Sequence, residues 1–256
     1  MAQGPASLAG AMNDLREADD VLLHLAAARG NLHQVWRSVE ELSGYARSAE
    51  RTLDDLEAET ARARLTPDDP RGTAYLRDAG AQMDVLRQRC TLTAATAEEI
   101  EQRLQVAKHH LVAAREHLAH FDSAPEADVA GLRTKVEDLG VLVDLATPLA
   151  QAARTHMQQA AQTAAALTSP NPLEADREYT VLRLDRGAQS AGRHVVRAEE
   201  AARHLDRTLE YAGAGVARSL GSAEMLAAAA HDRLRAGQQS SPAPNLGGDP
   251  PGGPAR

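Results

Sequence analysis

Histidine is the residue type in this chain with the clearest capacity for chemistry, because imidazole binds metals and exchanges protons near neutral pH. Four of the ten histidines fall within twelve residues of each other: His109, His110, His117 and His120. His117 and His120 are three residues apart, so on a helix they share a face and could hold one metal ion. The Glu-x-x-His motif of di-metal bundles and the His-Glu-x-x-His motif of zinc proteases are both absent. We therefore favour a solvated helix face here and expect neither a metal nor another cofactor.

Five histidines share a second property, which is their place in the helical repeat described below. They flank the apolar seam at the position called g, from which side chains reach toward a neighbouring helix: His24, His110, His117, His156 and His194. Protonation at that position near pH 6 would loosen or re-pair the helices. The simpler interpretation is an ordinary polar flank, and unchanged thermal stability between pH 7.5 and 5.5 would favour it.

An enzyme is not expected from the other residue types. Aromatic residues make up 2% of the chain, too few to line a typical ligand pocket. The single cysteine, Cys90, falls in the apolar repeat and is expected to be a small buried side chain. The glycine-rich stretch 213–221 lacks the Gly-Lys-Ser/Thr ending of a phosphate-binding loop. No set of serine, histidine and aspartate can be assigned as a catalytic triad.

The elements that carry these residues are predicted from a repeat of apolar residues with a period of 3.5. From Leu76 to Phe121, thirteen of the fourteen positions spaced alternately three and four residues apart are apolar. This is the a/d seam of a coiled coil, in which a narrow apolar stripe is buried against partner helices. Three other stretches show the same repeat. The chain is also rich in alanine and leucine, which are strong helix formers.

The breaks between the four repeats are marked by proline. Prolines at positions 67, 70, 125, 170 and 172 interrupt the pattern, and Ser123 with Glu126 has the form of a capping box that starts a helix. We expect helices at about 7–65, 72–122, 124–168 and 172–236. The first should continue through Gly30, its weakest point. Pro148 should kink the third helix or leave a backbone carbonyl without its hydrogen-bond partner. Short connections force neighbours to be antiparallel.

The predicted fold is thus an all-α, elongated, antiparallel four-helix coiled-coil bundle over residues 7–236. Residues 1–6 are expected to be flexible. Residues 237–256 contain mostly Pro, Gly, Ser and Gln and are expected to form a disordered tail.

Composition narrows the function to an interaction role. The net charge of −8, with both signs interspersed, disfavours nucleic-acid binding, which needs a clustered basic face. No signal peptide or membrane span is visible, so a cytoplasmic location is expected. We predict a non-enzymatic coiled-coil scaffold or adaptor that binds protein partners and self-associates. Trp36, beside the first seam, is a candidate partner contact.

Two alternatives remain open. One is a helical substrate or effector of a secretion system that does not read a signal peptide. The other is an amphipathic protein of the membrane surface, although the narrow seams and negative charge fit this less well. Detection in culture supernatant would favour the first alternative, and flotation with liposomes would favour the second.

Overall fold

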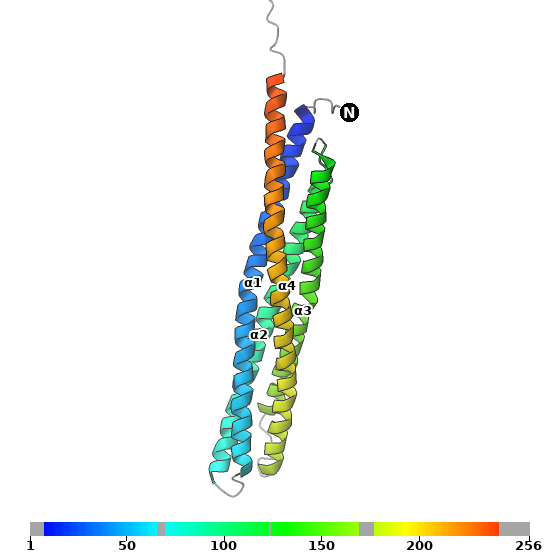
Figure 1. Ribbon diagram of the computed structural model, residues 1–256. Helices are drawn as coiled ribbons and strands as arrows, with labels where there is room; N and C mark the ends of the chain where they lie inside the picture. The colour runs from blue at the N-terminus through cyan, green and yellow to red at the C-terminus, as the bar shows by residue number, and fades with distance from the viewer. Residues whose placement is uncertain (1–7, 66–69, 123, 169–176, 241–256) are drawn as a thin grey trace, which may run out of the picture.

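The protein is a rod of four long helices. The computed structural model describes residues 8–65, 70–122, 124–168 and 177–240, and these contain α1 (Leu8–Leu65), α2 (Pro70–His117), α3 (Glu126–Thr168) and α4 (Arg177–Ser240) (Figure 1). No strand occurs in these ranges. At 1.5 Å per residue, the longest helix spans about 95 Å. The all-α, elongated four-helix bundle predicted from the repeats is confirmed.

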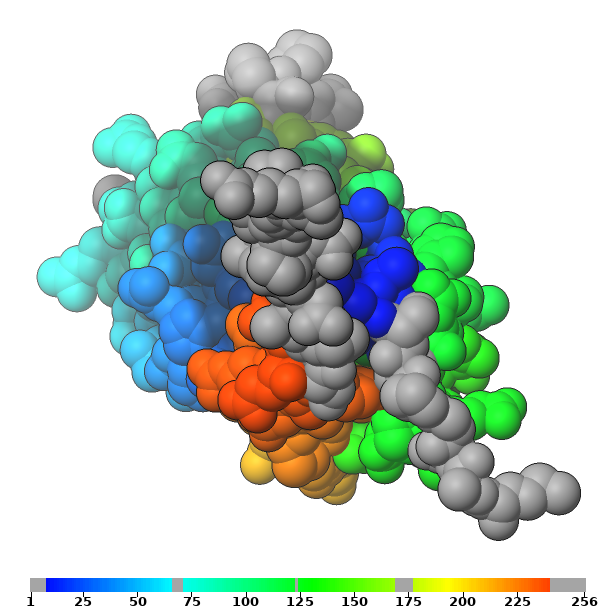
Figure 2. All heavy atoms as spheres, turned by 90° about the horizontal axis from the view of Figure 1, so that it is seen from above, coloured from blue at the N-terminus to red at the C-terminus, as the bar shows by residue number. Residues whose placement is uncertain are grey.

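Each helix packs along the two helices that neighbour it in a closed ring, in the order α1, α2, α3, α4 and back to α1. The neighbours are antiparallel. Asn13, near the start of α1, donates a hydrogen bond to the carbonyl of His120, just after the end of α2. Arg64, near the end of α1, pairs with Asp185, near the start of α4, at 2.7 Å. The start of α1, the end of α4 and the connection between α2 and α3 consequently lie at one end of the rod (Figures 1 and 2).

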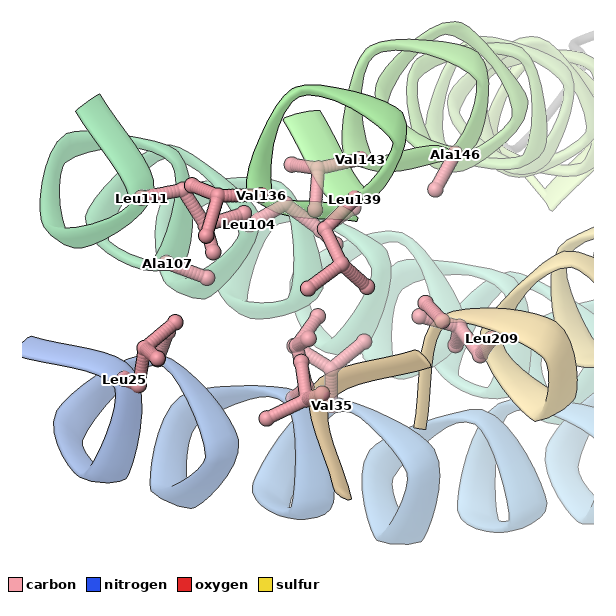
Figure 3. Close-up of a cluster of buried hydrophobic side chains, with 14 of the residues drawn as sticks. Leu25, Val35, Leu104, Ala107, Leu111, Val136, Leu139, Val143, Ala146 and Leu209 are labelled. Atoms are coloured by element: carbon pink, nitrogen blue, oxygen red, sulfur yellow. The ribbon is translucent and has the colours of Figure 1, made fainter. Parts of the chain in front are cut away.

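The core is built from the four seams. The side chains at the a and d positions are almost all buried, and Leu25, Leu104 and Leu139 are at most 1% exposed. Figure 3 shows side chains from all four helices pointing toward one another in the space between them. Each such burial stabilises the fold by about 1.5–3 kcal/mol relative to exposure. The seams are therefore satisfied within this single chain.

The two irregular positions inside the predicted helices are both accommodated. α1 continues through Gly30, and no glycine of the described residues has a positive φ. α3 continues through Pro148, and its seam residues on either side, Ala146 and Ala150, remain buried. The helical frame thus keeps its phase across both positions, as the unbroken repeat indicated.

Several helix ends differ from the predicted ones. α2 ends at His117 rather than near residue 122, because the next amides turn back by three residues: Ala119 bonds the carbonyl of Glu116, and His120 that of His117. α3 begins at Glu126, two residues later than expected. α4 extends to Ser240, so residues 237–240, predicted to belong to the disordered tail, are helical. The start of α1 lies beside this last turn, with Leu8 close to Gly237.

Some predictions fall outside the described residues. These are the flexible segment 1–6, the start of the fourth helix at 172–176 and the tail from 241 onward. Among the helices described, none combines the length and the apolar character that crossing a membrane requires.

Candidate functional site

The densest group of chemically capable side chains lies between α1 and α2 near the end of the rod that holds the chain's first helical turns. We call it the histidine–carboxylate cluster, and its members are Glu17, Asp20, His24, His110, His117 and His120. The repeat explains how they meet. On α1, the g residues Glu17 and His24 are one heptad apart, and on α2 the g residues His110 and His117 are also one heptad apart. Antiparallel packing of the two helices brings these two pairs together.

Glu17 and His117 form the centre of the cluster. Oε2 of Glu17 lies 2.8 Å from Nδ1 of His117 and 3.9 Å from Nδ1 of His120. Oδ2 of Asp20, one helical turn after Glu17, lies 3.8 Å from the same His117 nitrogen. Glu17, Asp20 and His117 each offer one ligand atom, and these three atoms all lie within 4.8 Å of one another.

Glu17 is buried, with its side chain 4% exposed. Burial by itself would raise the pKa of this carboxyl group, but the hydrogen bonds from Arg16 and His117 and the charge interactions with them together outweigh burial and lower the pKa below its ordinary value. Arg16 donates to Oε1 at 2.8 Å, while Oε2 faces the histidines. The two carboxylate oxygens therefore have separate roles.

His24 links the centre of the cluster to a second imidazole. Its Nδ1 lies 3.1 Å from Nδ1 of His110, so one nitrogen donates a hydrogen bond to the other. Its ring also stacks on that of His117, with centroids 5.5 Å apart. Burial is the main reason that the pKa of His24 is lowered, and the nearby His110 and His117 lower it further. Folding thus disfavours the protonated form of His24 relative to the unfolded chain.

A buried ion pair fastens the same end of the rod. Asp14 is fully buried. Its Oδ1 accepts a hydrogen bond from the amide of Asp122 at 2.7 Å, and its Oδ2 lies 3.4 Å from Nη1 of Arg233 on α4. Asp14 therefore connects α1 with the segment after α2 and with the last part of α4. These contacts hold the helices that carry the cluster in a fixed relation.

The remaining two flanking histidines meet elsewhere, between α3 and α4. Nδ1 of His156 lies 3.4 Å from Nδ1 of His194, with the rings stacked at 5.6 Å. Burial is the main reason that the pKa of His194 is lowered, and the nearby His156 lowers it further. All five predicted flanking histidines thus face a histidine or carboxylate of a neighbouring helix. Whether protonation loosens the bundle stays a prediction.

Sequence reasoning missed the acidic half of the cluster. It considered His117 and His120 as a metal pair without Glu17 and Asp20. A signal was present, because Glu17 occupies the g position one heptad before His24. Reading the flanking positions for carboxylates as well as histidines would have found it.

Trp36 marks a second, separate place on the surface. Its side chain is 46% exposed, and its ring stacks on His33 with centroids 6.2 Å apart. It lines a groove of about 340 Å³ between α1 and α4, together with Arg29, Leu32, His33, Leu209, Glu210, Gly213, Ala214 and Val216. Gly213 has no side chain to fill this space. We call this the Trp36 groove.

Cys90 is placed where it has little reactivity. Its side chain is fully buried in the core, and burial raises the pKa of the thiol to about 12. The thiolate, which is the reactive form, is therefore scarce at neutral pH.

No protein-family model and no curated protein matches this chain.

Proposed function

We propose that the chain is a non-enzymatic interaction protein, a stiff helical rod that binds a protein partner through the Trp36 groove. The observation that carries the proposal is the half-exposed side chain of Trp36 above an apolar floor. Tryptophan is the residue type most enriched among side chains that dominate binding energy, and it contributes most where a partner excludes water from it.

The shape and charge of the groove favour an amphipathic helix as the bound element. The groove lies between two antiparallel helices, so a third helix can lie along it with its apolar face inward. Its floor contains Leu32, Leu209 and Val216, and its rim carries one cation, Arg29, and one anion, Glu210. A partner helix that displays both charge signs beside its apolar face would complement this rim.

The burial of all four seams within one chain supports a role for the outer faces. The self-association predicted from the sequence remains a separate proposal, and its interface would then lie on those outer faces as well. The cytoplasmic location also remains a proposal, which cell fractionation tests.

The test uses Trp36 as both contact and reporter, because it is the only tryptophan in the chain. A photo-crosslinking residue next to the groove captures the partner, which is then identified and purified. Titrating it should blue-shift the emission of Trp36, and Trp36→Ala should weaken binding at least tenfold. Tyr211→Ala, which removes an exposed aromatic ring on α4 instead of α1, is the matched control and should bind normally. Equal affinities of the two variants would refute the proposed contact.

A further inference from the structure

The centre of the histidine–carboxylate cluster has the chemistry of a metal site. Glu17, Asp20 and His117 each present one ligand atom to a common space, and His120 adds an imidazole at its edge. Together they offer two carboxylates and two imidazoles from α1 and from the end of α2. Imidazole is a preferred ligand of zinc, copper, nickel and iron, whereas calcium and magnesium favour oxygen ligands alone.

The distances agree with a single small ion. Bonds of about 2.0–2.2 Å in a tetrahedral arrangement place ligand atoms roughly 3.3 Å apart. The His117 nitrogen lies 2.8 Å from the Glu17 oxygen and 3.8 Å from the Asp20 oxygen, values that bracket this separation. The Glu17 oxygen lies 3.9 Å from the His120 nitrogen. The ligand atoms of Glu17, Asp20 and His117 thus already lie close to bonding geometry, and His120 would complete the set by turning its exposed side chain toward them.

The surroundings hold the ligands in place and leave an approach from solvent. Arg16 occupies Oε1 of Glu17, so Oε2 alone is directed at the histidines, as a hydrogen-bonded carboxylate ligand should be. The ring of His24 stacks on His117 and limits its rotation. The side chains of Asp20 and His120 are 41% and 66% exposed, which gives an ion access from outside.

We propose that Glu17, Asp20, His117 and His120 bind one divalent transition-metal ion of the Zn²⁺ type. The ion would join the start of α1 to the end of α2, at the end of the rod that Asp14 and Arg233 already fasten. It would act as a structural clip, because a ligand that binds only the folded state raises its stability. The site is independent of the Trp36 groove and of the function proposed there.

The experiment uses the full chain, freed of metal by chelation and of any affinity tag, and titrated with Co²⁺ and then Zn²⁺. Visible d–d absorption reports Co²⁺ coordination, and calorimetry gives the stoichiometry. The expected result is one ion per chain, displacement of Co²⁺ by Zn²⁺ and a higher melting temperature with metal. Glu17→Gln and His117→Asn should each weaken binding at least tenfold. His156→Asn, in the other histidine pair, is the matched control and should bind as the unaltered chain does.

Three results would overturn the proposal. They are the absence of stoichiometric binding to the unaltered chain, binding that survives both Glu17→Gln and His117→Asn, and binding that only His156→Asn removes. Circular dichroism checks that each variant is folded. If the variants at buried Glu17 or at His117 lose helix, Asp20→Asn decides the question, because Asp20 is partly exposed and asparagine has nearly the same size. Retained affinity in a folded Asp20→Asn variant would then refute the site.

Discussion

Replacing Gly30 by alanine should stabilise the protein, because α1 passes through this position as a regular helix. The backbone of Gly30 does not have a positive φ, and apart from the adjacent backbone of α1 and the two neighbouring residues, no atom lies within 4 Å of the place where the new methyl group would stand. The substitution therefore adds no contact and no clash. What remains is the difference in helix propensity between glycine and alanine.

That difference predicts the size of the effect. Glycine costs about 1 kcal/mol relative to alanine in a helix interior, so the free energy of unfolding should rise by about that amount. For a domain of this size the melting temperature should rise by about 2–4 °C. Gly44 is equally open and lies fourteen residues away, so the double variant Gly30→Ala/Gly44→Ala should gain about 2 kcal/mol if the sites are independent.

Urea denaturation followed by circular dichroism measures both gains. Gly187→Ala is the matched control, because its methyl group would overlap Cδ1 of Leu167. Leu167 would have to move, so this variant should gain less than the other two or lose stability. A loss of 1 kcal/mol or more in Gly30→Ala would refute the continuous helix, since alanine is penalised where glycine ends a helix with positive φ.

Two further substitutions test the seams and their flanks. Ser219 is fully buried at a d position of α4, and its hydroxyl has no hydrogen-bond partner among the described residues. Ser219→Ala removes this unpaired hydroxyl, so it should raise the free energy of unfolding by about 1–3 kcal/mol. Thr93→Ala, which removes a hydroxyl bonded to the carbonyl of Arg89, should give no such gain, and equal effects in urea denaturation would contradict the assignment. Because the pKa of His194 is lowered in the folded protein, the unfolded chain binds the proton more readily, and stability present above pH 6.5 declines as the pH falls below it. His194→Gln should reduce the fall in melting temperature between pH 7.5 and 5.5, whereas the same change at exposed His204 should not; identical profiles for the two variants would exclude a contribution of His194.

The seams could be predicted from the sequence because the residues that a coiled coil buries recur at a fixed short spacing along the chain. Leu76, Met83 and Cys90, one heptad apart, already indicated one buried face, and antiparallel order followed from the short connections. The helix ends could not be predicted as well. α2 ends early where the amides after His117 bond backward by three residues, and the last turn of α4 lies beside the start of α1. Neither feature is visible in the repeat.

The candidate sites, like the helices, could be predicted only in part. The repeat placed the five flanking histidines beside the seams, because position in a heptad fixes the face on which a side chain lies. It did not say which of them would meet. The pairing of His117 with Glu17, a hundred residues away, depends on the axial register between α1 and α2, which a one-heptad slip would change. The Trp36 groove likewise requires Gly213 of α4 to lie opposite Trp36.

Small-angle scattering with an absolute mass calibration tests most directly whether the four seams close within one chain. The structure predicts a rod whose helical part is about 95 Å long, as the 64 residues of α4 require at 1.5 Å each. Each four-helix bundle should consist of a single chain. This holds both for isolated rods and for rods that associate side by side through their outer faces. A two-chain particle much longer than about 150 Å, with two chains contributing to each four-helix cross-section, would contradict the account. The seams would then be shared between chains.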